Sequence, residues 1–240
     1  MTVFADVLAR QLRADSSRPL VTFYDDATGE RVELSVTTYA NWVAKTASLL
    51  VEEHGLERGQ SVLVDLPPHW LGPVFLGAAW SAGLVVVGPE EAPDAVVCGP
   101  DGLARWTPHA ADIPVLACSL LPLGVRFAEP MPPDVHDVGV DVWSQPDSFT
   151  PWDPPTANDP ATGASYGGAT QGETWATAAA GSLLTDGGRL LTEANPASPP
   201  GLATFTEPLA RGGSLVLVVH AGPGRLDAVS TAERVTARFP

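Results

Sequence analysis

The spacing of hydrophobic residues switches between a helical and a strand period along the first part of the chain. Residues 3–14 repeat apolar positions at three- and four-residue intervals, which predicts a helix. Residues 20–24 and 31–34 are short apolar runs separated by a turn rich in Asp and Gly, so we expect a hairpin. Ser35 then has the side-chain oxygen typical of a helix N-cap, ahead of an apolar face that continues to Leu50.

Strand and helix patterns then alternate in a way that is typical of a parallel sheet. Residues 61–66 form an apolar run that two prolines stop, 70–82 form an almost continuously apolar helix, and 84–87 form the next strand. Two more short apolar runs, 95–98 and 114–119, predict further strands. Because a strand, a helix and a second strand pack with a right-handed crossover, we expect parallel neighbours here.

The second half of the chain has a proline-rich stretch followed by regular elements. Residues 129–160 carry eight prolines and show no clear period, which predicts an irregular segment. Beyond it, the pattern predicts helices at 173–184, 201–210 and 226–238 and strands at 189–192 and 214–219.

These elements predict an α/β fold built from two βαβ-type lobes with mostly parallel sheets. The first lobe would comprise residues 1–128 and the second 161–240, with 129–160 as an irregular connection between them. The alternative is one compact domain over which 129–160 is draped as a long loop, and the pattern leaves both open.

Composition narrows the classes of function. The chain has 240 residues and a formal net charge of −15, so a polyanion would be repelled and nucleic-acid binding is disfavoured. No run of about 18 apolar residues occurs, which predicts no membrane span. Residues 1–12 have no apolar signal-peptide core, so we expect a cytoplasmic protein.

Residue types that bind metals or carry out redox chemistry are dispersed. Cys98 and Cys118 stand alone, without a CxxC spacing, and each ends a short apolar run, so we interpret both as buried residues at strand ends. The five histidines show no HxH or HxxxH spacing, and we predict no metal site. The sequence leaves open whether the two cysteines lie close together.

The order of several short motifs resembles a known family. A Thr-Tyr helix start, a helix with a Leu-rich end, a G-x-x-x-G turn before an apolar strand, a Leu-Pro turn and an apolar helix ending in Ala-Gly follow one another at 38–39, 47–50, 55–62, 66–67 and 82–85. A second block of motifs is similar at 208–217 and 232–236. Together these blocks resemble the N-terminal part of the AMP-binding superfamily, the adenylate-forming enzymes that include acyl-CoA synthetases.

This resemblance implies a phosphate-binding loop between the two blocks. The family's loop reads Tyr-Thr-Ser-Gly-Thr-Thr-Gly, one variable residue and Pro-Lys-Gly, and this chain has Tyr-Gly-Gly-Ala-Thr-Gln-Gly at 166–172. Glycines in such a loop let backbone N–H groups converge on a phosphate, while the lysine supplies positive charge. The implied ligand-binding residues, as a vestigial phosphate loop, are Tyr166, Gly167, Gly168, Thr170 and Gly172.

The same resemblance implies that several catalytic parts are missing. The lysine position holds Trp175, and Glu173 places a carboxylate where an anion would bind. The family's aromatic-His element would fall near 194–200, which has no histidine, and its adenine, magnesium and catalytic-lysine motifs lie beyond residue 240. Lys45 lies on the first long helix, where we expect it to be solvated.

We therefore expect a catalytically incomplete adenylate-forming homologue that acts as a binding or regulatory module. Its partner would be an unknown protein or small molecule, and a homodimer is one form of assembly that we consider. We predict no catalytic residue and no cofactor, with weak AMP or ATP binding as a variant. The alternative is a partial enzyme that binds ATP or an acyl-adenylate and needs a partner domain.

A different motif overlaps the same loop. Residues 163–167 have the G-x-S-x-G spacing of a hydrolase nucleophile elbow around Ser165. The residues before it do not read as a central strand, and Asp227 follows His220, whereas that fold expects the acid first. A serine hydrolase is therefore a remote alternative.

Three tryptophans, Trp143, Trp152 and Trp175, lie in or just after the proline-rich stretch. They could line a cleft against the Gly-rich loop or anchor the irregular segment to the sheet. We favour anchoring, because irregular segments need large apolar side chains to stay ordered.

Overall fold

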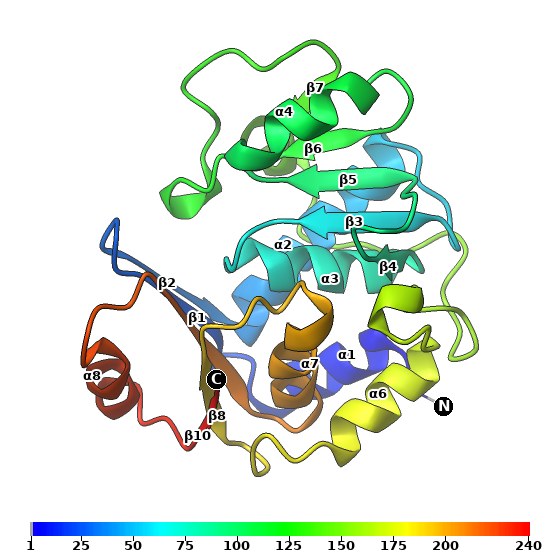
Figure 1. Cartoon of the computed structure of the whole chain (residues 1–240). Helices are drawn as coiled ribbons and strands as arrows, with labels where there is room; N and C mark the ends of the chain where they lie inside the picture. Colours follow the sequence, from blue (N-terminus) through cyan, green and yellow to red (C-terminus); the bar gives the residue numbers. More distant parts are fainter. Residues whose placement is uncertain (1) are drawn as a thin grey trace.

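Strands from both ends of the chain share the first of two sheets, sheet A. The computed structural model describes residues 2–240 (Figure 1). Sheet A has the order β10-β8-β9-β1-β2, in which β1 (Pro19–Asp25) is antiparallel to β2 (Glu30–Ser35) and parallel to β9 (Ser214–Val219). The strands β8 (Arg189–Thr192) and β10 (Ala237–Phe239) continue it in parallel.

The middle of the chain forms sheet B, in which all neighbouring strands are parallel. Its order is β4-β3-β5-β6-β7, and its strands are β3 (Ser61–Asp65), β4 (Val85–Val87), β5 (Ala95–Cys98), β6 (Val115–Ala117) and β7 (Val135–Asp137). The predicted α/β class with mostly parallel sheets is therefore confirmed.

Eight α-helices accompany the sheets in the part of the chain that is described. They are α1 (Phe4–Asp15), α2 (Val36–Ser48), α3 (Leu71–Ala82), α4 (Leu103–Trp106), α5 (Val138–Asp141), α6 (Gln171–Ala180), α7 (Ala203–Ala210) and α8 (Arg225–Ala232). Ser35 caps α2 as predicted, since its side chain accepts from the N–H of Thr38 at 3.1 Å. Gly83 ends α3 in the left-handed conformation, with φ of 75°.

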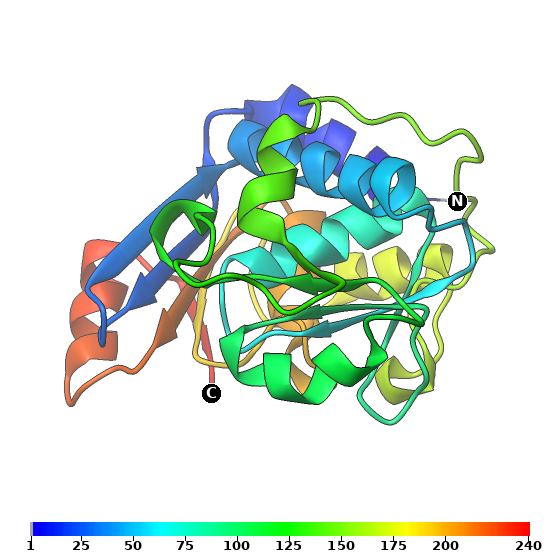
Figure 2. The same ribbon diagram turned by 90° about the horizontal axis from the view of Figure 1, so that it is seen from above.

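Three apolar clusters show that these elements stack in five layers. The central cluster joins the inner faces of both sheets to α1, α2, α3, α6 and α7. A second cluster packs the outer face of sheet B against Trp106 of α4, and a third packs the outer face of sheet A against Val229 of α8. Figure 1 shows α4 and α8 on these outer faces, and Figure 2 shows β1 and β2 projecting with α8 away from sheet B.

The proline-rich stretch is more regular than its composition predicts. Within 129–160, Val135–Asp137 pairs with β6 as an edge strand, and Asp137 then caps the short helix α5 through the N–H of Gly139. A three-residue strand produces no readable period, and its pairing is tertiary, so the sequence alone did not reveal it.

The end of the chain also differs from the prediction. The helix expected over 226–238 ends at Ala232, and Arg234, with φ of 52°, turns the chain into β10. Glu233 stabilises this turn because its carboxylate accepts from Arg31 and from Arg189. Ala237–Phe239 can then pair with β8.

Sheet membership crosses the two predicted lobes. The hairpin β1–β2 comes from residues 1–128 but pairs with β9, which comes from 161–240. The central cluster is also shared by both ranges. The domain boundaries themselves remain a prediction.

Cys98 and Cys118 are free and buried; Cys98 ends β5 and Cys118 directly follows the neighbouring strand β6, as expected for strand-end residues. The N–H of Cys118 donates to the carbonyl of Cys98 at 2.9 Å. Cys98 belongs to the outer cluster of sheet B, whereas Cys118 belongs to the central cluster. The two side chains therefore point to opposite faces of the sheet, which rules out a bond between their sulfur atoms.

Candidate functional site

The loop at 166–172 joins a single helical turn, Ala164–Tyr166, to α6. Gly167 and Gly168 follow that turn with φ of 93° and 67°, in the left-handed region where glycine is favoured. Thr170 then caps α6, since its side chain accepts from the N–H of Glu173 at 3.2 Å. The helix therefore begins two residues before the predicted position, at the Thr-x-x-Glu capping box.

Every backbone N–H of this loop donates a hydrogen bond within the chain. The acceptors for residues 166, 167 and 168 are backbone carbonyls at 2.9–3.0 Å. The N–H of Ala169 donates to the hydroxyl of Thr162 at 3.0 Å. The N–H groups of Gln171 and Gly172, the first two residues of α6, donate to the carbonyls of Asp159 and Ala157, both at 2.8 Å. These groups are therefore already used by the fold.

Glu173 satisfies the remaining N–H of the loop. Its carboxylate accepts from the backbone N–H and from the hydroxyl of Thr170, both at 2.9 Å. These two hydrogen bonds hold the pKa of Glu173 below its ordinary value, so the group is ionised at neutral pH. A negative charge of the protein itself thus lies where a phosphate would have to approach.

Trp175, at the position of the family's lysine, is a core residue. Its side chain is only 2% exposed and packs against Phe4 and Trp80, with ring centroids 5.7 and 5.4 Å away. Its indole N–H donates to the side-chain oxygen of Gln171 at 3.3 Å. Trp175 therefore anchors α6 to α1 and α3 and places no group in the loop.

The two tryptophans inside the proline-rich stretch, Trp143 and Trp152, are more exposed than Trp175. Trp143 is half exposed and packs edge-on against Trp42 of α2, at 5.4 Å between ring centroids. Trp152 is 100% exposed, so it neither lines a cleft nor anchors the segment.

Lys45 is not the solvated helix residue that the sequence suggested. Its ammonium group pairs with Asp147 at 3.1 Å and donates to the carbonyl of Gln145. The Lys45 side chain is only 18% exposed. The lysine therefore holds the proline-rich stretch against α2, a contact that its position on the helix could not reveal.

A second carboxylate is held by backbone N–H groups beside the loop. Glu91 accepts from the N–H of Gly88 at 3.0 Å, of Ala164 at 2.9 Å and of Ser165 at 3.2 Å. These hydrogen bonds, that of Gly88 foremost, hold the pKa of Glu91 below its ordinary value. The donors that could form an anion-binding nest on this side of the loop therefore hold a side chain of the protein.

Tyr166 is fixed in place by its hydroxyl, which donates to the carbonyl of Ala197 at 2.6 Å. Burial raises the pKa of Tyr166 to about 12, so the phenol stays protonated at neutral pH. Of the residues predicted as a phosphate loop, Tyr166 and Thr170 are thus bound internally, while Gly167 and Gly168 shape the turn.

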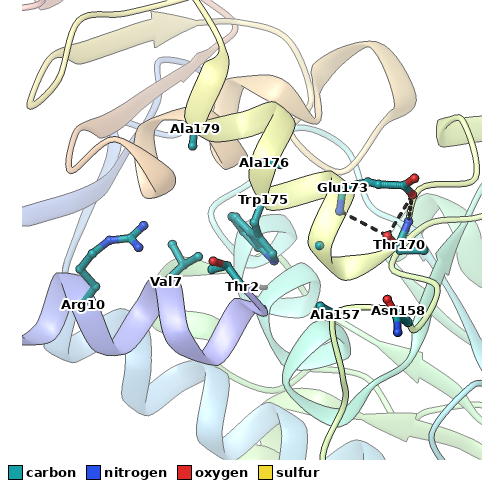
Figure 3. A pocket seen from close by; sticks show the side chains of 11 residues that line it. Thr2, Val7, Arg10, Ala157, Asn158, Thr170, Glu173, Trp175, Ala176 and Ala179 are labelled. Carbon is teal, nitrogen blue, oxygen red and sulfur yellow. Dashed lines mark hydrogen bonds between the residues drawn. The ribbon is translucent and has the colours of Figure 1, made fainter.

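A cavity of about 550 Å³ lies behind the loop, between α1 and α6 (Figure 3). Figure 3 shows Val7 and Arg10 on α1 opposite Ala176 and Ala179 on α6. Arg10 also donates to the carbonyl of Ala210 at 3.3 Å, and most of the wall is apolar. The charged residues that line this cavity are Arg10 and Glu173, and its described lining contains no convergent set of acid–base groups.

The residues of the hydrolase motif do not converge. Segment 160–162 makes only isolated bridges, so the strand that a nucleophile elbow requires is not formed. His220 pairs with Asp25 at 2.7 Å, while Asp227 pairs with Arg238 at 2.8 Å. The backbone N–H of Ser165 is bonded to Glu91. The geometry thus offers no Ser-His-Asp arrangement around Ser165.

A crevice of about 310 Å³ opens where the strands of both sheets end. It lies at the carboxyl ends of β1, β8 and β9 in sheet A and of β3 in sheet B. Ligands of open parallel α/β sheets bind at this edge, in the crevice beyond the carboxyl ends of the strands. The wall combines apolar and titratable side chains: Phe23, Asp25, Pro67, Pro68, His69, Leu120, Glu193, Val218, Val219 and His220.

Two histidines give the crevice its hydrogen-bonding character. His69 is 4% exposed and its Nδ1 accepts from the N–H of Leu71 at 3.3 Å, whereas its Nε2 is buried and has no partner among residues 2–240. Burial lowers the pKa of His69 to about 4, so the ring is neutral at pH 7 and carries its proton on Nε2. His220 is exposed, and its Nδ1 lies 2.7 Å from Oδ1 of Asp25.

The sequence prediction missed these residues, although a signal for them was present. Asp25, His69 and His220 each lie at or just beyond the end of a predicted strand, where parallel sheets bring side chains together. Which strand ends meet depends on sheet order, and the pairing of β1 with β9 joins residues far apart in the chain.

The described residues contain no group of three or more His, Cys, Asp and Glu side chains placed to hold a metal ion. Among residues 2–240, no helix has both the length and the apolar character needed to cross a membrane.

Comparisons with known proteins fit the fold. No family model matches the chain. A protein of Mycobacterium tuberculosis described as a "TIGR03089 family protein" is 34% identical over 245 residues, which cover 98% of this chain and 97% of that protein.

Two solved structures have the same architecture. An acyl-CoA synthetase of Brucella canis superposes with a TM-score of 0.76 and 15% identity, over 99% of this chain and 47% of the enzyme. A coronafacic acid ligase of Pectobacterium brasiliense superposes with a TM-score of 0.71 and 12% identity, over 91% of this chain and 46% of the enzyme. The chain thus spans less than half the length of either enzyme, and the predicted adenylate-forming type of fold is confirmed.

Proposed function

The chain belongs to the TIGR03089 family, and from this premise and the geometry of its loop we propose that it is an adenylate-forming-type domain that does not adenylate through that loop. It serves instead as a binding or regulatory module. Its ligand is a small molecule that occupies the crevice at the carboxyl ends of the strands.

One observation carries this proposal: the N–H groups of 166–172 all donate within the chain. A phosphate would have to displace these internal acceptors before it gained any hydrogen bond. Each exchange of partners yields little net free energy, since an intramolecular hydrogen bond of this kind contributes about 1 kcal/mol. The loop therefore supports a structural role more than a ligand-binding one.

The charges around the loop point in the same direction. Glu173 and Glu91 are both ionised and both bonded to backbone N–H groups, whereas the lysine position holds the buried Trp175. Catalysis of phosphoryl or adenylyl transfer depends on positive groups aimed at the charge that develops. Two carboxylates in their place disfavour both nucleotide binding and the reaction.

Calorimetric titration with ATP, AMP and a non-hydrolysable acyl-adenylate analogue tests this proposal. We expect no heat of binding above dilution from any of the three. Gly168→Trp serves as the loop variant: a Cβ added to Gly168 would meet no neighbouring atom within 4 Å, but the φ of 67° strains any other residue, so the fold of this variant is checked by circular dichroism. Tight binding to the wild type that this variant abolishes would contradict the proposal.

A second candidate is a partial enzyme that binds ATP or an acyl-adenylate and works with a partner domain. The open space beside Gly167 and Gly168 supports it, since a Cβ added at either would meet no atom within 4 Å and glycine is the residue whose backbone is least restricted. So does the length of the two enzymes of similar fold, of which this chain covers 47% and 46%. Nucleotide binding in the titration above would favour this candidate over the module.

A further inference from the structure

The carboxyl ends of β1 and β9 bring an acid and an imidazole together in the crevice. Asp25 is the last residue of β1, and its register partner is Val219, the last residue of β9. His220 is the next residue after Val219, which places it beside Asp25. Nδ1 of His220 lies 2.7 Å from Oδ1 of Asp25. The Asp25 side chain is 14% exposed and that of His220 is 65% exposed. The carboxylate is therefore largely buried at the sheet edge, whereas the imidazole is accessible to solvent.

The hydrogen bonds around Asp25 fix its charge. Burial raises the pKa of Asp25, but hydrogen bonds from His220, the N–H of Ala27 and the hydroxyl of Thr28 outweigh it and hold the pKa below its ordinary value. An ionised Asp25 can only accept a hydrogen bond, so Nδ1 of His220 carries the hydrogen and donates it. The lone pair of the neutral imidazole is therefore on Nε2.

The backbone at His220 is held in a strained conformation. Its φ is 56°, in the left-handed region that non-glycine residues seldom adopt. Residues held in sparsely populated backbone regions cluster at active sites and ligand-binding segments, and histidine enters this region more often than most residues. Here the conformation places the imidazole at the mouth of the crevice, against Asp25.

A second histidine of the crevice has an unpaired hydrogen-bond donor. His69 lines the same crevice, and its buried Nε2–H has no acceptor in the described part of the chain. A buried donor without a partner costs free energy unless a bound molecule or a water satisfies it. A carbonyl oxygen is an acceptor of the kind that this N–H would take.

The remaining walls restrict the size and charge of a substrate. Phe23, Leu120 and Val218 are among the apolar residues of the wall, and the volume of about 310 Å³ suits a short acyl chain. Glu193 and Asp25 are the carboxyl side chains of the wall, so they disfavour an anion.

We propose that the crevice hydrolyses short-chain, uncharged acyl esters or thioesters, with His220 as the general base and Asp25 as its positioning residue. Nε2 of His220 takes a proton from a water molecule, and the water oxygen forms a bond to the carbonyl carbon. The Nε2–H of His69 stabilises the carbonyl oxygen as it becomes negative. The bond to the leaving oxygen or sulfur then breaks, and the imidazolium returns the proton, which yields a carboxylic acid and an alcohol or thiol.

This inference rests on the proposed binding of a small molecule in the crevice. Two probes distinguish that binding from hydrolysis. The amide N-(4-nitrophenyl)butanamide, which resists hydrolysis, reports binding in calorimetry. The ester 4-nitrophenyl butyrate reports turnover through release of 4-nitrophenol. Binding of the amide without hydrolysis of the ester overturns the inference and keeps the proposed ligand site, whereas no binding of the amide and no turnover overturns both.

The expected result is saturable hydrolysis of the ester that depends on the pair. His220→Ala should lower kcat/KM by about 100-fold or more, the range for loss of a general base. Asp25→Asn should lower kcat by at least about 10-fold with KM unchanged, because it disturbs only the orientation and tautomer of His220. A residue that merely supported the fold would move the melting temperature instead, so each variant is melted in parallel.

His109→Ala is the matched control, since His109 is an exposed histidine on another segment and packs on Trp106. It should leave the hydrolysis unchanged. Hydrolysis that survives in His220→Ala, or that is lost in Ser165→Ala, would overturn the assignment of the base.

Discussion

Replacing Trp175 by alanine tests whether this residue is a core anchor and not part of a ligand site. Its ring is 2% exposed and lies between Phe4 of α1 and Trp80 of α3. Alanine would leave a cavity at the junction of three helices. The N–H of Phe4 would keep its acceptor, because Gln171 accepts from it as well as from Trp175.

The magnitude follows from the buried area. A buried tryptophan removes roughly 200 Å² from water, which at about 25 cal/mol per Å² contributes about 5 kcal/mol. Alanine retains roughly 1 kcal/mol of this, so the variant should lose about 4 kcal/mol of unfolding free energy, within the usual range of about 3–5 kcal/mol for such changes. That loss is a large fraction of the total of about 5–15 kcal/mol expected for a native protein.

Urea denaturation followed by circular dichroism measures the loss. Trp152→Ala is the matched control, because the same side chain is removed from a position that is 100% exposed. We expect a change within about 0.5 kcal/mol for this control. A loss below about 1 kcal/mol for Trp175→Ala, equal to that of the control, would refute the reasoning that Trp175 holds α6 to the core.

Two further predictions concern the crevice and the loop. The folded state lowers the pKa of His69 from 6.5 to about 4, so the unfolded chain gains a proton first as the pH falls, and stability present above pH 6.5 is lost on approach to pH 4. Between pH 6.5 and pH 4 the free energy of unfolding, measured by urea titration, should therefore fall by about 3 kcal/mol more for the wild type than for His69→Phe. Parallel plots of unfolding free energy against pH for the two proteins would contradict this. Thr170→Ala removes the N-cap of α6 and should cost about 1 kcal/mol in the same assay, whereas an unchanged midpoint would show that the cap does not stabilise the helix.

The parts of the fold that could be predicted are those with long apolar runs. The strands β1, β3 and β5 each bury at least three consecutive residues, so they are visible in the sequence as apolar runs. The strands β7 and β10 have three residues each and lie at sheet edges, where pairing with a distant strand decides their conformation.

The loop and the crevice also differ in how far they could be predicted from the sequence. The loop is a local feature, and both its glycines and the Thr-x-x-Glu capping box can be read from adjacent residues. That its N–H groups are satisfied could not be predicted, because the acceptors at Ala157 and Asp159 come from the irregular stretch. The crevice depends on sheet order, which brings Asp25 and His220 together although 195 positions separate them.

Exchange of labelled pyrophosphate into ATP by the purified chain alone, with a panel of carboxylic acids and an acyl-CoA synthetase as positive control, tests the central claim most directly. If the N–H groups of 166–172 are held by the fold and Glu173 occupies the anion's place, no acid should raise the exchange above the rate without protein. Exchange that requires a carboxylic acid and proceeds with no second protein would contradict the account.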